Sequence, residues 1–141
     1  MQPISFFKLQ AKNLYKDYKT QYTYIDDVDG ESYFSYSPKY FDIDHLFLSY
    51  EHNEDHFSLM KAQHFIACLL GFEKWSDLIN APEKEQELVM LLFKNKMNIE
   101  EWKLYVRDIE TSNNVTFEFD SQIELVNNNF IERDSIFNHP S

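Results

Sequence analysis

The sequence predicts an α+β fold that is mostly α-helical, with five to six helices around a buried central helix and one small N-terminal β-hairpin. Three observations carry this prediction. Several segments place apolar residues at spacings of three and four, two tyrosine-rich segments flank a turn sequence, and residues 58–70 form the most apolar run. The chain has no internal repeat and no linker that would divide it, so we expect a single domain over residues 1–141.

Residues 4–19 are expected to form an amphipathic helix. Its apolar positions recur every three or four residues and therefore share one face. They are Ile4, Phe7, Ala11, Leu14 and Tyr18. A second stripe of the same helix carries Lys8, Lys12, Lys16 and Lys19. Three interpretations are open: the lysines pair with the protein's own acidic segment, they face water, or they bind an external anion. The first two are favoured, because most charged helix stripes are solvated.

A β-hairpin is expected next. Residues 21–25 and 32–36 are rich in tyrosine and threonine, which favour strands. Between them lies the sequence Asp-Asp-Val-Asp-Gly, in which Gly30 can supply the positive φ that a turn needs. Pro38 should end the second strand because it cannot donate to a ladder.

The other helices are predicted from their end signals. Asp42 or Asp44 should cap a helix that runs through Tyr50, and Gly71 should end the central helix at about residues 58–70. Four more helices follow: a short one capped by Ser76 and ending near Asn80, one after Pro82, one after the capping box at Asn98, and one after the capping box at Ser121 that runs through Phe130. Residues from about 133 to 141 are expected to fray.

The composition excludes several kinds of chemistry. Gly30 and Gly71 are the only glycines, so the chain cannot build a phosphate-binding loop, a dinucleotide fingerprint or the nucleophile elbow of hydrolases. Cys68 is the only cysteine, which excludes an intramolecular disulfide and a multi-cysteine zinc site. No cofactor is predicted. Without a signal-peptide pattern or an apolar run of roughly 18 residues, we expect a cytoplasmic protein with no membrane segment.

The net charge of −11 is unevenly distributed. Residues 1–25 carry a net charge of +3, whereas residues 26–55 hold nine acids against Lys39 alone, a net charge of −8. The acidic segment is either a solvated surface or a docking face for a basic partner. Binding to nucleic acid is disfavoured because phosphates need a basic patch, which this chain has only in its first helix.

Tyrosines interleave with the acidic segment. Exposed tyrosines serve as anchors in interfaces, although on a small hairpin they pack as often against a helix. The sequence leaves these two readings open. The candidate partner-binding residues are Tyr22, Tyr24, Asp26, Asp27, Asp29, Tyr33 and Tyr36.

Two pairs of residues resemble reactive or metal-binding sites. His52 and His56, with Asp55, are candidate metal ligands, but Asn53 stands where a zinc protease needs glutamate. His64 and Cys68 have the spacing of a thiolate–imidazole pair. A nucleophilic cysteine needs an electropositive, partly exposed setting, and Cys68 lies in the most apolar run, so we interpret it as structural.

Two segments resemble a known group of proteins. The first contains Lys8, Gln10, Ala11, Lys12 and Leu14, and the second contains Ala62, Gln63, Ala67, Leu70, Gly71, Phe72, Trp75 and Leu78. Together they resemble small bacterial helical proteins that carry a glyoxalase-superfamily-related label. The resemblance covers about a third of the chain and rests on packing residues. It implies a bacterial helical protein and no catalytic residue, because the repeated units and strand-borne metal ligands of true glyoxalases do not occur here.

These observations predict a non-enzymatic, acidic interaction module of the bacterial cytoplasm. Its expected partner is a protein with a basic surface, and its expected role is that of an immunity, antitoxin or inhibitor protein. Two alternatives remain open. One is a metal-dependent enzyme or metal-binding protein that uses the His52/His56 region, and the other is a nucleic-acid-associated protein that uses the N-terminal lysine stripe.

Overall fold

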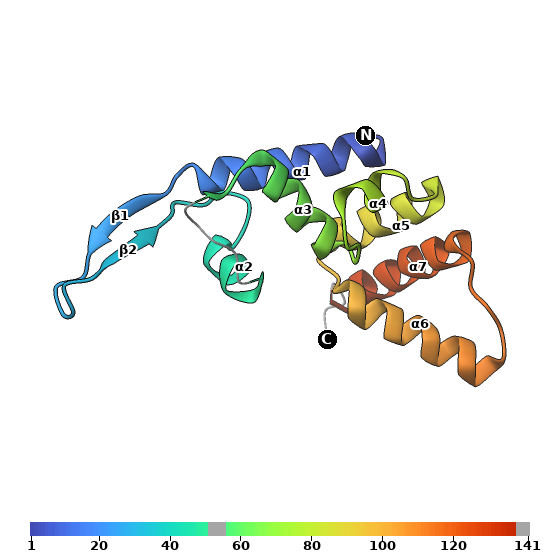
Figure 1. Ribbon diagram of the computed structural model, residues 1–141. Helices are drawn as coiled ribbons and strands as arrows, with labels where there is room; N and C mark the ends of the chain where they lie inside the picture. Colours follow the sequence, from blue (N-terminus) through green and yellow to red (C-terminus); the bar gives the residue numbers. More distant parts are fainter. Residues whose placement is uncertain (51–55, 138–141) are drawn as a thin grey trace. The chain divides into compact units, whose positions relative to one another are not determined.

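The computed structural model describes residues 1–50 and 56–137 of the chain (Figure 1). Its elements confirm the predicted α+β fold that is mostly helical, with a single two-stranded antiparallel sheet in the described residues. In chain order they are α1 (Pro3–Tyr18), β1 (Tyr22–Ile25), β2 (Ser32–Ser35), α2 (Ile43–Tyr50), α3 (Leu59–Leu69), α4 (Trp75–Ile79), α5 (Glu83–Lys94), α6 (Ile99–Asn113) and α7 (Phe119–Phe137).

The chain divides into two compact units. One unit comprises Met1–Ile4 and Ala67–Ser141, and we call it the C-terminal unit; the other, Ser5–Ile66, is the hairpin unit. Each is described by itself below. The single domain expected over residues 1–141 stays a prediction.

The hairpin unit is built on an aromatic core. In α1, the predicted apolar face is buried at Phe7, Ala11 and Leu14. At the C-terminal end of this helix, the ring of Tyr18 lies 4.9 Å from that of Phe57, centroid to centroid. Phe57 in turn lies 5.2 Å from Phe47 of α2 and 5.5 Å from Phe65 of α3. These edge and tilted contacts are the favourable arrangements of aromatic rings, and they join three helices of the unit.

Asp17 fixes the segment that follows the hairpin. Its side chain is buried, and its carboxylate accepts three backbone N–H bonds of 2.8 Å, from Lys39, Tyr40 and Phe41. Burial of a carboxylate is costly unless it is hydrogen-bonded, and these three donors meet that need. The end of α1 and the start of the path to α2 are therefore tied together at one residue.

The base of the hairpin is anchored to the same end of α1. The Thr20 hydroxyl donates to the carbonyl of Asp17 at 2.6 Å and accepts from the backbone N–H of Ser37 at 2.8 Å. The Gln21 amide donates to the Tyr36 hydroxyl at 2.8 Å. Each bond joins the chain entering the hairpin to the chain leaving it or to α1, so the strands emerge from a fixed base.

In the C-terminal unit, α6 begins as its sequence predicts. The Asn98 side chain accepts a hydrogen bond from the backbone N–H of Glu101 at 3.0 Å, which is an N-cap. The indole of Trp102 donates to the amide oxygen of Gln122 at 3.0 Å and so links α6 to α7. Buried Gln86 of α5 donates to the last carbonyls of α4, those of Leu78 and Ile79, at 3.0 Å each.

Several predicted helix ends differ from the observed ones. Lys74, not Ser76, is the N-cap of α4, and Ser76 lies inside the helix. The capping box predicted at Ser121 is wrong, because α7 already begins at Phe119. The same helix extends beyond the predicted end at Phe130 to Phe137. The other predicted elements appear within two residues of their expected starts, and Gly71, with φ of +87°, ends α3 as expected.

Candidate protein-interaction surface

The register of the hairpin sorts its side chains onto two faces. Tyr22 lies opposite Ser35, and Tyr24 lies opposite Tyr33. Directly opposite residues of an antiparallel pair share a face, and alternate residues along a strand do so too. Tyr22, Tyr24 and Tyr33 therefore lie on one face, which we call the tyrosine face. The opposite face carries Thr23, Ile25, Ser32 and Phe34.

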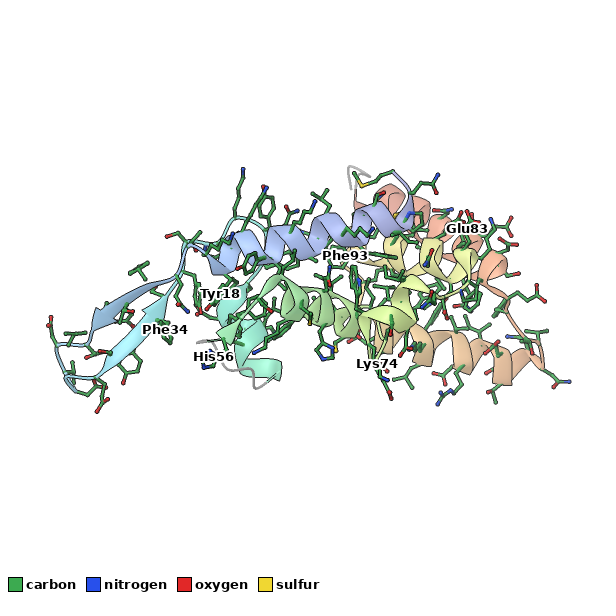
Figure 2. All side chains as sticks on the ribbon, turned by 45° about the horizontal axis from the view of Figure 1, so that its top comes forward. Tyr18, Phe34, His56, Lys74, Glu83 and Phe93 are labelled. Atoms are coloured by element: carbon green, nitrogen blue, oxygen red, sulfur yellow. The ribbon has the colours of Figure 1, made fainter. Side chains whose placement is uncertain are left out.

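Both faces are open to solvent. Tyr22, Tyr24 and Tyr33 are 52%, 46% and 42% exposed, and every strand residue except half-buried Ser35 is exposed. Phe34 of the opposite face is exposed as well (Figure 2). Isolated two-stranded hairpins are only marginally stable in water, because they have no hydrophobic face to bury. Of the two readings that the sequence left open, packing against a helix and exposure, the structure places these three tyrosines in the exposed arrangement.

The loop at the tip of the hairpin is acidic and internally bonded. The Gly30 N–H donates to the carbonyl of Asp26 at 2.9 Å, and Gly30 has φ of +74°, as its place in the sequence predicts. The Asp26 carboxylate accepts from the N–H of Val28 at 2.7 Å, and that of Asp29 from the N–H of Glu31 at 2.8 Å. The side chain of Val28 at the tip is 95% exposed. Backbone hydrogen bonds therefore position the carboxylates of Asp26 and Asp29 without neutralising them.

Asp29 connects the acidic loop to the tyrosine face. Its carboxylate accepts a hydrogen bond from the Tyr33 hydroxyl. This bond, followed by the one from the N–H of Glu31, lowers the pKa of Asp29 below its ordinary value, and the same carboxylate raises the pKa of Tyr33. Asp29 is thus ionised and Tyr33 protonated at neutral pH. A negative charge stands next to the exposed rings.

Two other tyrosines of this region lie elsewhere. Tyr36, predicted as a partner-binding residue, is only 9% exposed, and its ring lies 6.0 Å from that of Phe47 and 6.2 Å from that of Tyr18. Tyr36 belongs to the aromatic core and is not part of the exposed tyrosine face. Tyr40 is exposed, and the Lys39 ammonium lies 5.4 Å from the centre of its ring.

The lysine stripe of α1 is fully exposed. Lys8, Lys12, Lys16 and Lys19 are all accessible to solvent, and none forms an ion pair with any residue that the structure describes. Lys19 instead lies 4.4 Å from the centre of the Tyr15 ring. Within the described residues, the acidic loop and the lysines do not neutralise each other.

The metal and thiol candidates gain no support. His52 and Asp55 lie outside the described residues, and His56 is exposed. Among the side chains that the structure describes, those of residues 1–47 and 56–128, no three histidine, cysteine or acidic groups gather as a metal site would require. Burial raises the pKa of Cys68, the opposite of what activates a thiolate, while His64 on the same helix is exposed.

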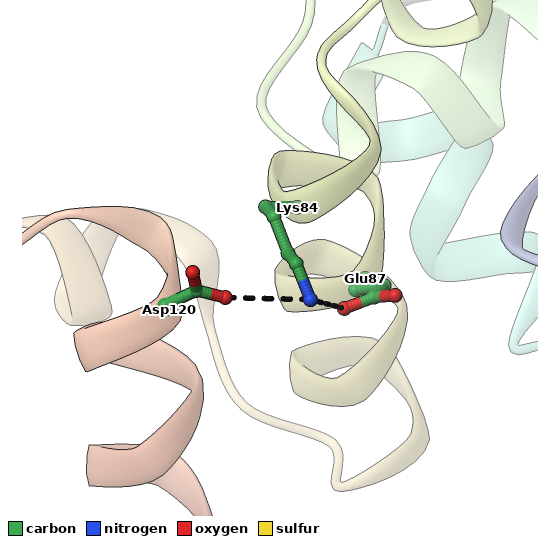
Figure 3. A network of polar contacts seen from close by, with 3 residues as sticks. All are labelled: Lys84, Glu87 and Asp120. Atoms are coloured by element: carbon green, nitrogen blue, oxygen red, sulfur yellow. Dashed lines mark hydrogen bonds and ion pairs between the residues drawn. The ribbon is translucent and has the colours of Figure 1, made fainter.

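Lys84 and Asp120 line a shallow hollow in the C-terminal unit. Lys84 of α5 bonds to Glu87 at 3.3 Å and lies 3.4 Å from the carboxylate of Asp120 on α7 (Figure 3). The hydrogen bond from Lys84 to Glu87, followed by the one to Asp120, raises the pKa of the lysine. A lysine that two carboxylates hold in the charged form is not a nucleophile at neutral pH. We therefore interpret the network as a structural contact between α5 and α7.

Comparison of the chain with protein-family models, with curated proteins and with solved structures gives no significant match. The resemblance to glyoxalase-related bacterial proteins therefore stays a prediction. Among the described helices, none has both the length and the apolar character needed to cross a bilayer.

Proposed function

We propose that this protein is a non-enzymatic interaction module that binds a protein partner with a basic surface through its hairpin. The single observation that supports this most is the tyrosine face, on which three tyrosines are exposed beside an ionised loop. Tyrosine supplies a large, rigid contact area at a low cost in conformational entropy, which is why it is enriched among interface anchors. Carboxylates around such anchors steer a basic partner and select it over acidic ones.

The concrete role that we propose is that of a bacterial cytoplasmic immunity, antitoxin or inhibitor protein. Such a protein acts by covering a surface of its target, so it needs an exposed anchor and complementary charge rather than a catalytic cleft. The hairpin offers both on a fixed base. A toxin or enzyme that acts on nucleic acid carries the basic surface that this hairpin would match.

Charge reversal on the hairpin tests the proposal. The tagged wild-type protein and the variant Asp26→Lys/Asp27→Lys/Asp29→Lys are used to capture partners from the native host, and the bound proteins are identified by mass spectrometry. We expect the wild type to retain a basic protein that the variant loses. The matched control, Asp77→Lys/Asp108→Lys/Glu124→Lys, makes the same change in net charge at exposed acids of the C-terminal unit and should retain the partner.

A second variant separates lost binding from a damaged loop. Asp27 and Glu31 are exposed, and their carboxylates accept no hydrogen bond from the described residues. The variant Asp27→Lys/Glu31→Lys therefore leaves the bonds of the loop intact and should still lose the partner. Capture that is equal for the wild type and both hairpin variants would contradict the proposal.

Nucleic-acid binding is a second candidate function, because the lysine stripe has no ion pair with any described residue. Three lysines along α1, with Lys19 directly after it, would contact phosphates, and such binding weakens steeply as salt is raised. Gel shifts with single-stranded and double-stranded probes in 50 and 200 mM salt decide it. A shift that salt abolishes and that Lys12→Glu/Lys16→Glu removes would favour this candidate over the first.

A further inference from the structure

The tyrosine face contains a pair of rings with a fixed carboxylate at its edge. The rings of Tyr24 and Tyr33 lie side by side on the same face of the two strands, with centroids 5.9 Å apart and planes inclined by 34°. The hydroxyl of Tyr33 is bonded to the carboxylate of Asp29. A cation that lies on these rings would therefore also meet a negative charge whose position is set by the same tyrosine.

Other tyrosines of the hairpin unit already hold a cation. The ammonium of Lys19 lies 4.4 Å from the ring centre of Tyr15, and that of Lys39 lies 5.4 Å from the ring centre of Tyr40. Both distances are within the range of cation–π attraction. Among the described residues, no cation lies over Tyr22, Tyr24 or Tyr33.

We propose that the tyrosine face and Asp29 bind an arginine side chain of the partner. This inference rests on the proposed function and names the group that the hairpin recognises. Charge complementarity favours a cation, and the chemistry of the guanidinium group favours arginine over lysine. The planar guanidinium stacks on aromatic rings and at the same time presents two parallel N–H groups to a carboxylate. The ammonium of lysine is more strongly hydrated and cannot do both.

Two peptides of equal charge test the preference. One is acetyl-Thr-Arg-Thr-Arg-Thr-amide and the other has lysine in place of both arginines, so that alternate side chains of an extended peptide share one face. Their dissociation constants are measured with the full-length protein by titration followed in two-dimensional amide spectra. We expect the arginine peptide to bind roughly fivefold more tightly, which is the size of a cation–π contact at an exposed site.

Matched variants on the two faces locate the preference. Tyr24→Leu removes one ring of the pair and should abolish the difference between the peptides. Phe34→Leu removes a comparable exposed ring from the opposite face and should leave it unchanged. Amide spectra of both variants without peptide confirm that the hairpin is folded. Loss of the preference in Phe34→Leu, or its retention in Tyr24→Leu, would overturn the assignment.

The outcomes separate this inference from the proposed function. If both peptides bind with equal affinity to the wild type and neither binds Asp27→Lys/Glu31→Lys, the arginine assignment is overturned. The hairpin would then still be a surface for a basic partner. Absence of binding by either peptide also overturns the arginine assignment, while the capture experiment decides the proposed function independently.

Discussion

Asp17 shows how a single residue sets the position of a whole segment. Its carboxylate holds the N–H groups of residues 39–41, and no pattern in the sequence points to it, because its partners are more than twenty positions away. In the sequence, Asp17 stands out only as the one acid among the lysines of the first helix. Long-range side-chain bonds to backbone depend on the final fold and leave no local periodicity to detect.

The variant Asp17→Asn tests this anchor. An amide keeps one acceptor oxygen but turns an NH₂ group toward backbone donors, so we expect the free energy of unfolding to fall by about 3 kcal/mol. Urea denaturation followed by the near-ultraviolet circular dichroism of the tyrosines measures the change in the hairpin unit. The exposed control Asp27→Asn should change stability by less than about 0.5 kcal/mol. Equal midpoints for wild type and Asp17→Asn would show that the three bonds contribute nothing net.

A second residue-scale prediction concerns the pair of Asp29 and Tyr33. Because the hydroxyl of Tyr33 is the largest cause of the lowered pKa of Asp29, Tyr33→Phe should move that pKa back toward its ordinary value of 3.8. Because the pKa of Asp29 is lower in the folded than in the unfolded protein, the ionised carboxylate stabilises the loop at pH values above the pKa of the unfolded protein. This stabilisation is lost as the pH falls through the pKa of the folded protein. Carbon-detected NMR titration of the Asp29 carboxyl measures it. An unchanged titration midpoint in Tyr33→Phe would contradict the bond.

At the scale of elements, the sequence predicts where helices and strands occur more reliably than where they end. The four-residue capping pattern occurs at both Asn98 and Ser121, but only Asn98 caps a helix. The side chain of Gln122 explains the difference, since it accepts from Trp102 and donates to the carbonyl of Phe117 at 3.2 Å. These bonds accompany a helix that starts two residues before Ser121. The contact with Trp102 is tertiary, and the local capping pattern does not contain it.

The cap of α6 gives a direct test of a correct prediction. Replacing Asn98 by alanine leaves the N–H of Glu101 without its acceptor, and we expect a loss of about 1 kcal/mol in the free energy of unfolding. In a Trp75→Phe background, Trp102 is the sole tryptophan, and its fluorescence reports on this helix during urea denaturation. Asn98→Asp restores an acceptor at the same position and should recover the stability. A full loss in both variants would mean that the side-chain bond is not the cause.

The lysine stripe of α1 should itself lower helix stability. Lys8, Lys12 and Lys16 stand at successive i, i+4 positions, where like charges repel. Lys12→Glu replaces two repulsive pairs by two attractive ones, so we expect the free energy of unfolding to rise by roughly 0.5–1 kcal/mol in low salt. The gain should shrink in 1 M salt, where charges are screened over about 3 Å. A loss of stability of Lys12→Glu in low salt would contradict this prediction, because it would mean that Lys12 makes a favourable charge interaction in the wild type.

At the scale of the whole molecule, the net charge of −11 is less informative than its distribution. The sequence alone predicted the acidic segment, the lysine stripe and the hairpin that the two tyrosine-rich segments form. What the sequence left open was whether those tyrosines pack inward. The register places Tyr22, Tyr24 and Tyr33 on one face, and their exposure shows that this face is open, whereas Tyr36, one residue beyond β2, is buried in the aromatic core. Alternation within a strand is readable from sequence, but which face is covered depends on the rest of the fold.

Amide hydrogen exchange of the captured complex tests the central claim most directly. The protein is exposed to deuterated buffer alone and with its captured partner, and uptake is compared segment by segment. Binding through the hairpin predicts slower exchange over residues 22–35, with residues 99–113 of α6 exchanging as in the free protein. Unchanged exchange over residues 22–35, together with protection elsewhere in the chain, would contradict the hairpin as the interaction surface.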